Sequence, residues 1–262
     1  MKELIHFAHG NGFPALCYRQ MLEALTDYAD YCYLDRIGHN PKYPVSENWH
    51  NLVAELIESV RLQADRPVIA VGHSLGGALS FLAAAERPEL FKAVILLDSP
   101  LLGPLKSTMV RLAKALGFID HVTPAHKTRA RRQHWQTRDE VIDYLRSREL
   151  FANFTTECLY DYVDYGLEHT NKGYSLRFNR AIEYRIYRTI PHIIPAYEGK
   201  FNLPAALIYG AKSNIVGTMD LHYMKKKFGI VCQKTSGSHL FPMEYPQQAA
   251  QEILNALSFL GL

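Results

Sequence analysis

The chain has little that would place it in or across a membrane. Its longest apolar strand-like run, "AVILL" at 93–97, is far shorter than the roughly 20 residues of a membrane-spanning helix. The first residues, "MKELIHFAHG", reach a turn signal at Gly10 before the apolar region of a signal peptide could form. We therefore expect a cytoplasmic protein without a membrane span.

The chain also lacks the patterns of disulfide-rich, metal-binding and nucleic-acid-binding proteins. Its four cysteines show neither CxxC spacing nor a disulfide framework, which favours buried free thiols in a reducing compartment. No HExxH motif is present, so we expect no metal site. The net charge is only +3, and no basic run is interleaved with stacking aromatics, so nucleic acid is not an expected partner.

The composition is that of a folded protein, and its apolar residues follow an alternating rhythm. Hydrophobic residues make up 48% of the 262 residues and charged residues 21%, both near the average for globular proteins. Short apolar runs alternate with longer amphipathic stretches, which predicts an α/β fold with a mostly parallel, doubly wound sheet. The expected strands are 4–8, 31–35, 67–73, 92–98, 205–211 and 230–235, and the expected helices are 15–27, 47–64, 76–86, 218–228 and 246–260.

The middle of the chain, residues 101–203, lacks the strand rhythm and has the pattern of several helices broken by prolines. We expect a core domain formed by 1–100 and 204–262, with 101–203 inserted as a helical unit. Residues 104–148 are rich in lysine and arginine, which indicates either a solvated helix face or attraction of an anionic substrate. Residues 151–201 are rich in tyrosine and phenylalanine and would supply an apolar pocket.

The stretch "VGHSLGG" (71–77) joins an expected strand to an expected helix and contains a G-x-S-x-G pattern around Ser74. A serine on a sharp strand-to-helix turn needs small residues two positions before and after it, because larger side chains would clash. Gly72 and Gly76 satisfy this need. The helix N-terminus behind the turn favours developing negative charge, so Ser74 is a candidate nucleophile.

A second turn, "FAHGNGFPA" (7–15), follows the first expected strand and leads over the same edge of the sheet. Its backbone N–H groups are candidates for half of an oxyanion hole. We expect the two donors to be the N–H groups of Leu75, next to the nucleophile, and Asn11. An ordinary glycine turn is the alternative interpretation, and His9 is expected to brace the loop.

The candidate general base is His239 in "TSGSHLFPMEYP" (235–246). It lies in a turn between the last expected strand and the last expected helix, where a ring nitrogen can reach the serine hydroxyl. The other histidines lack this placement. His73 is beside Ser74, but its side chain is expected to point away around the turn, in a structural role.

Together these motifs resemble the α/β-hydrolase fold superfamily, in particular serine hydrolases with a helical cap. The segment "LDRIGHN" (34–40) also looks like that family's Asp-x-x-Gly-His loop, in which Asp35, Gly38 and His39 shape the backbone. The resemblance implies that 101–203 is a cap over the active site that selects substrates. Relatives that use an aspartate nucleophile are disfavoured by Ser74 at that position.

The third member of the triad is the open question. In similar proteins the acid most often follows the strand that here is "ALIYGA", but Asn214 occupies the matching position and cannot offset a positive imidazolium. Asp98 ends the strand next to the one that carries Ser74, and some α/β-hydrolases place the acid there. The alternatives are that Asp98 caps a turn, that Asp220 acts with Asn214, or that the acid is missing.

These features predict a serine hydrolase that cleaves a carboxylic ester or related acyl bond of a small molecule through an acyl-enzyme, without a cofactor. Ser74 would be the nucleophile, His239 the base and Asp98 the acid. A thioesterase or acyltransferase using the same triad, or a non-catalytic ligand-binding protein of the same fold, remains an alternative. The sequence leaves the oligomeric state open.

Overall fold

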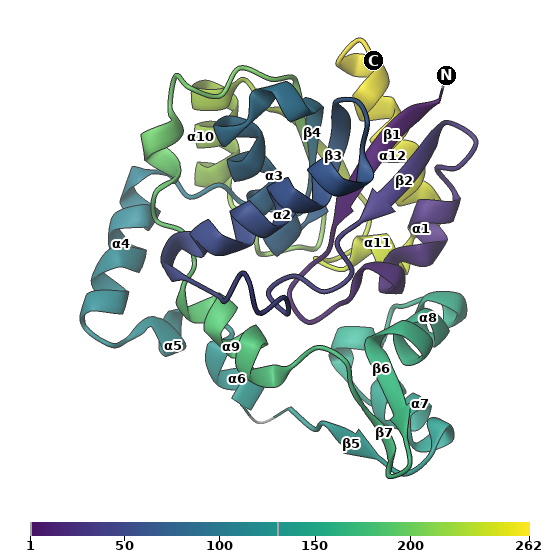
Figure 1. Cartoon of the computed structure of the whole chain (residues 1–262). Coiled ribbons are helices and arrows are strands. Elements are labelled where there is room, and N and C mark those ends of the chain that lie inside the picture. The colour runs from purple at the N-terminus through teal and green to yellow at the C-terminus, as the bar shows by residue number, and fades with distance from the viewer. Residues whose placement is uncertain (1, 130) are drawn as a thin grey trace.

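A six-stranded parallel sheet forms the centre of the protein. The computed structural model describes residues 2–129 and 131–262, and within them the strand order is β2-β1-β3-β4-β8-β9 (Figure 1). The strands are β1 (Glu3–Ala8), β2 (Ala29–Tyr33), β3 (Val68–His73), β4 (Phe91–Leu97), β8 (Ala205–Gly210) and β9 (Val231–Thr235). Every neighbouring pair is parallel. The predicted α/β fold class is confirmed, with strand limits within two residues of those expected.

The strands are almost continuously apolar because helices cover both faces of the sheet. Alternate residues of one strand point to opposite faces, so Val68 and Ala70 of β3 join one hydrophobic cluster and Ile69 and Val71 the other. The helices of the core are α1 (Arg19–Glu23), α2 (His50–Gln63), α3 (Leu75–Glu86), α10 (Thr218–Phe228), α11 (Phe241–Glu244) and α12 (Pro246–Phe259). Residues of α2, α3 and α10 pack on the first face and residues of α1, α11 and α12 on the second. Short 3-10 turns occupy Ala15–Tyr18, Glu47–Trp49, Pro88–Leu90, Glu149–Phe151 and Ile194–Tyr197.

The segment between β4 and β8 lies outside this sheet, to the left at α4 and below it at α6 to α9 in Figure 1. Its helices are α4 (Pro104–Ala115), α5 (Ile119–Val122), α6 (Ala125–Arg129), α7 (Arg138–Arg146), α8 (Thr156–Gly166) and α9 (Arg180–Arg188). It also contains an antiparallel sheet of β5 (His134–Trp135), β7 (Gly173–Leu176) and β6 (Leu167–Thr170), in that order. The sequence pattern indicated several helices and gave no sign of this small sheet, because strands of two to four residues are too short to show alternation.

One predicted helix is shorter than expected. Residues 15–27 contain a 3-10 turn followed by α1, which ends at Glu23. In the part of the chain that the structure describes, no helix has both the length and the apolar character needed to cross a bilayer.

Candidate active site

Ser74 lies at the turn between β3 and α3, and its backbone is in an unusual conformation with φ 51° and ψ −113°. The two flanking glycines are required by close backbone contacts. A Cβ atom on Gly72 would lie 2.4 Å from the carbonyl oxygen of Gly76, and one on Gly76 would lie 2.0 Å from the carbonyl oxygen of Ala8. The turn therefore brings the start of α3 directly against the end of β1.

Asp98 follows β4, the strand next to β3, and is completely buried. Its carboxylate is surrounded by donors. His239 Nδ1 lies 2.6 Å from Oδ2, the Ser213 hydroxyl donates to Oδ2 at 2.5 Å, and the Gly210 N–H donates to Oδ1 at 3.0 Å. An ionised carboxylate only accepts hydrogen bonds, so His239 carries its proton on Nδ1 and leaves Nε2 free to accept another.

Ser74 and Asp98 occupy equivalent places at the ends of adjacent strands. His73 pairs with Leu97 in the β3–β4 register, and the Ser74 N–H donates to the Leu97 carbonyl at 2.9 Å. Within residues 2–129 and 131–262, no hydrogen bond engages the Ser74 hydroxyl. The His239 side chain is 29% exposed, so part of it is open to solvent.

The two candidate oxyanion donors lie in neighbouring turns. Leu75 is the first residue of α3, so its N–H has no partner within the helix, and Asn11 lies in the turn that follows β1. Neither N–H donates to another residue in the described part of the chain. The helix dipole adds positive potential at the Leu75 end, which suits a developing oxyanion.

The side chain of Asn11 connects this turn to the segment between β4 and β8. Its Nδ2 donates to the Glu183 carbonyl of α9 at 3.0 Å. The Glu183 carboxylate in turn pairs with Arg131 at 2.9 Å, and Arg131 also donates to the Tyr162 hydroxyl. These residues were not anticipated from the sequence, because their contacts with the turn join positions more than a hundred residues apart.

The aromatic side chains of the same segment also contact the turn. The rings of Phe151, Phe154 and Tyr162 pack against Phe13, with ring centroids 5.2–6.4 Å apart. The sequence suggested that these aromatics line an apolar pocket. In the structure they form part of the packing between the inserted segment and the core.

The alternative acids lie elsewhere. Asn214 is exposed. Asp220 is buried, but it pairs with Lys106 at 2.6 Å and accepts from the Gly217 N–H at 2.9 Å, so it stabilises the start of α10. Neither residue contacts His239 in the hydrogen bonds of the described residues.

The remaining loop residues have structural contacts. His9 Nε2 accepts from the Ile37 N–H at 2.9 Å, and burial lowers the pKa of His9 to about 4, so the ring is neutral. The Gly38 N–H donates to Glu55, and Asp35 pairs with Arg177 at 2.9 Å. These contacts agree with bracing and loop-shaping roles. His39 likewise accepts from the Asn179 N–H through Nε2.

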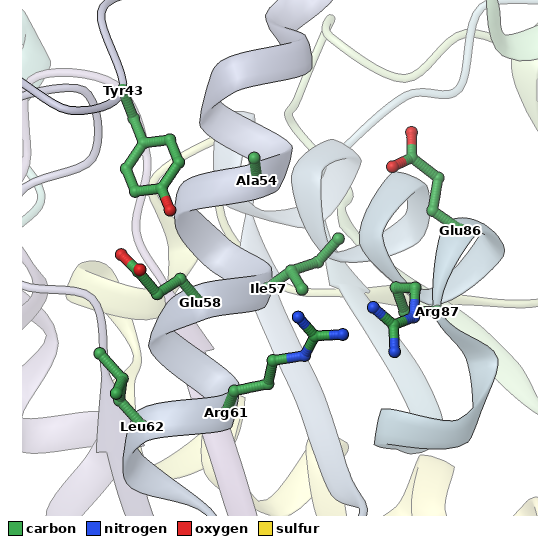
Figure 2. A pocket seen from close by; sticks show the side chains of 8 residues that line it. All are labelled: Tyr43, Ala54, Ile57, Glu58, Arg61, Leu62, Glu86 and Arg87. Carbon is green, nitrogen blue, oxygen red and sulfur yellow. The ribbon is translucent and has the colours of Figure 1, made fainter.

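A surface groove of about 740 Å³ is separate from this site. Figure 2 shows it between α2, which contributes Glu58 and Arg61, and the end of α3, where Glu86 is followed by Arg87. Ser74 precedes the other end of α3, roughly 18 Å away along a helix of twelve residues. The groove therefore does not lead to Ser74.

Comparisons with known proteins assign this chain to one family. A model of the alpha/beta hydrolase family matches residues 7–252, so the chain belongs to that family of hydrolases. It is 27% identical to the uncharacterized hydrolase YugF of Bacillus subtilis over 94% of this chain and 86% of that protein. It is 34% identical to rat monoglyceride lipase, over 45% of this chain and only 43% of the lipase. The crystal structure of E-2-(acetamidomethylene)succinate hydrolase has a TM-score of 0.77 at 18% identity, covering 98% of this chain and 92% of that one.

Proposed function

We propose that this protein is a serine hydrolase that cleaves a carboxylic ester or related acyl bond of a small molecule. The observation that carries the proposal is the 2.6 Å contact between Asp98 Oδ2 and His239 Nδ1, made by a carboxylate with no solvent exposure. A carboxylate in this position fixes the tautomer of the histidine and stabilises the imidazolium that forms during catalysis. Ser74, on the adjacent strand end, is the nucleophile.

The mechanism needs only groups of this chain. His239 Nε2 removes the proton from the Ser74 hydroxyl as the oxygen attacks the acyl carbonyl, and the Leu75 and Asn11 N–H groups stabilise the oxyanion. His239 then gives this proton to the leaving alcohol, and an acyl-enzyme forms. Water activated by the same histidine releases the acid and restores Ser74.

Residues 101–203 act as a cap on the core of 1–100 and 204–262 in this proposal. Support comes from the contacts that Asn11 and Phe13 make with this segment, because both lie in the turn that supplies an oxyanion donor. Among the cations of its basic first part, 104–148, five form ion pairs: Lys106, Lys114, Arg131, Arg132 and Arg138. This pairing favours an uncharged ester over an anionic substrate. The four free cysteines fit a reducing, cytoplasmic environment.

The test is labelling with a fluorophosphonate, which reacts with activated serines, combined with hydrolysis of p-nitrophenyl esters of graded chain length. We expect rapid labelling that is lost in Ser74→Ala. Ser80→Ala is the matched control, because Ser80 is a buried serine of α3, the helix that follows Ser74, and its hydroxyl has no partner among the described residues. Labelling that survives Ser74→Ala would overturn the nucleophile. An inert wild-type protein would favour the ligand-binding alternative.

A comparison of substrates separates ester from thioester chemistry. Acyl-CoA thioesters of matched acyl length are compared with the p-nitrophenyl esters by kcat/KM. Preference for the ester supports the proposal, whereas a preference for the CoA thioester would move the assignment to a thioesterase on the same triad.

A further inference from the structure

His73 makes contacts that the mechanism above does not use. Its side chain is buried, 1% exposed, directly before Ser74. His73 Nε2 lies 2.8 Å from the backbone carbonyl oxygen of His239, and Nδ1 lies 2.7 Å from the Tyr18 hydroxyl. The same hydroxyl oxygen accepts from the Gly10 N–H at 3.1 Å. A chain of three hydrogen bonds therefore joins two loops of the site.

The directions of these hydrogen bonds follow from the two end groups, the His239 carbonyl and the Gly10 N–H. A carbonyl oxygen only accepts, so His73 carries its proton on Nε2 and donates to the His239 carbonyl. In the neutral ring Nδ1 is then an acceptor, and the Tyr18 O–H donates to it. The Tyr18 oxygen is left to accept from the Gly10 N–H. Both ring nitrogens of His73 and the hydroxyl group of Tyr18 therefore have hydrogen-bond partners.

The neutral state of His73 agrees with its surroundings. Burial lowers the pKa of the ring well below its usual value and outweighs the opposite effect of the hydrogen bond to the His239 carbonyl. The rings of His73 and His239 have centroids 4.7 Å apart at 37°. A positive charge on His73 would oppose the imidazolium that forms on His239, so a neutral ring suits this place.

His73 and Tyr18 leave no room for a side chain at Gly10. A Cβ atom on Gly10 would lie 2.7 Å from His73 Nδ1 and 2.9 Å from the Tyr18 hydroxyl oxygen. Glycine at this position lets the loop backbone approach the bridge closely. Asn11, the next residue, supplies the candidate oxyanion donor.

We propose that His73 and Tyr18 are positioning residues that hold the backbone of His239 and the Gly10–Asn11 loop at a fixed separation. The inference rests on the proposed function. Asp98 orients the ring of His239 through Nδ1, while His73 fixes the backbone from which that ring extends. The base and the oxyanion donor are thus tied together through one pair of side chains.

The experiment compares His73→Leu, which removes both hydrogen bonds, with His73→Gln, whose amide N–H can reach the His239 carbonyl. With a p-nitrophenyl ester we expect kcat to fall roughly tenfold or more in His73→Leu while KM changes little, because small misplacements of catalytic groups cost that much. His73→Gln should recover most of this loss. Tyr18→Phe, which removes a single oxygen atom, should show a smaller loss in kcat.

Equal losses in the leucine and glutamine variants, or a rise in KM at unchanged kcat, would overturn the proposal. If His73→Leu does not fold, Tyr18→Phe is compared with wild type, and a loss in kcat at nearly unchanged KM supports the proposal. A purely structural role would lower the thermal midpoint of each variant without this split between kcat and KM.

A second readout does not depend on activity. In ¹⁵N-histidine NMR spectra, the resonances that disappear in His73→Gln should have the signature of a neutral ring protonated on Nε2 and should not titrate between about pH 5 and 8. A ring protonated on Nδ1, or one that titrates in this range, contradicts the hydrogen bonds from His73 to His239 and Tyr18. Failure of the proposed function is seen separately, as wild-type protein that the fluorophosphonate does not label.

Discussion

Ser74 and Asp98 share an uncommon backbone conformation. Both have positive φ angles, 51° and 43°, which non-glycine residues rarely adopt. Such residues cost of order 1–3 kcal/mol each and persist only where their surroundings hold them. Here the Ser74 N–H donates to the Leu97 carbonyl and the Asp98 N–H to the Ile208 carbonyl. The sheet edge thereby keeps both side chains in conformations that an isolated turn would avoid.

Asp98→Asn is expected to lower kcat by about 10⁴-fold while the protein remains folded, because an amide stabilises the wrong histidine tautomer and cannot balance its charge. The measurement is kcat for a p-nitrophenyl ester together with the far-UV circular dichroism spectrum. Asn214→Ala is the matched control and should leave activity unchanged, since Asn214 is exposed. The reverse order of the two effects would assign the acid to the loop after β8.

Glu55 should make stability depend on pH. Its carboxylate is 3% exposed and accepts from the Gly38 N–H at 2.7 Å, and burial raises its pKa to about 7. Because the folded-state pKa is above the unfolded value of 4.5, stability is fully present below pH 4.5 and is lost as pH rises through 7. The loss is about 3 kcal/mol, at roughly 1.4 kcal/mol per pH unit.

Glu55→Gln should remove this pH dependence. Urea unfolding at pH 5, 6, 7 and 8 is expected to give a variant that matches wild type at low pH and is more stable at pH 8. Glu157→Gln, at an exposed position of α8, should follow the wild-type slope, because this carboxylate stays in contact with water in the folded protein. Parallel curves for wild type and Glu55→Gln would contradict the argument.

At the scale of elements, much of the site follows from strand order. Strands β3 and β4 have long apolar runs, so their ends were predictable, and a right-handed crossover places them side by side. This placement, together with the resemblance to hydrolases that carry the acid after this strand, selected Asp98 as a candidate. Ser213 and Gly210 were missed as its partners, because their contacts require β8 to lie beside β4 across an insertion of about a hundred residues.

The histidine beside the nucleophile illustrates a different limit. A structural role for His73 was predicted, but its partners were not, since the ring contacts Tyr18 from an early helical turn and the backbone of His239 near the end of the chain. Local sequence carries no signal for such contacts. The small strands β5 to β7 were not predicted for a related reason, because their stability depends on pairing with each other.

A buried ion pair joins α9 to the stretch that follows α6 within the inserted segment. Glu183 is 6% exposed and pairs with Arg131, whose guanidinium lies above Gly12. Removing one partner of such a pair leaves an uncompensated charge, so Glu183→Ala should cost about 3–5 kcal/mol. Urea unfolding at pH 7 measures this change.

The control for that ion pair is Glu89→Ala. Glu89 pairs with Arg87 at the surface, where loss of a pair changes stability little. Similar destabilisation by the two substitutions would show that burial of the Arg131 pair contributes nothing. A small effect of Glu183→Ala alone would indicate that Tyr162 is sufficient to stabilise the guanidinium.

At the scale of the whole molecule, all four cysteines lie in or against the two hydrophobic clusters on opposite faces of the sheet. Cys17 and Cys158 are each 1% exposed and belong to the same cluster, whereas Cys32 and Cys232 are half-buried and pack against the other. Burial raises the pKa of Cys32 and of Cys158 to about 11, and it raises the pKa of Cys17 and Cys232 as well. The reactive thiolate form is therefore scarce at neutral pH.

Thiol reactivity should consequently report global unfolding. With 5,5′-dithiobis(2-nitrobenzoic acid) at pH 8, we expect slow reaction of Cys32 and Cys232 in the folded protein and no detectable reaction of Cys17 and Cys158. All four thiols should react at once in denaturant, because unfolding exposes them and returns each pKa toward its ordinary value. The rate of modification of Cys17 and Cys158 should then rise with urea in parallel with the loss of circular dichroism. Rapid reaction of either thiol in the folded protein would mean that this face of the core opens locally, without unfolding of the whole molecule.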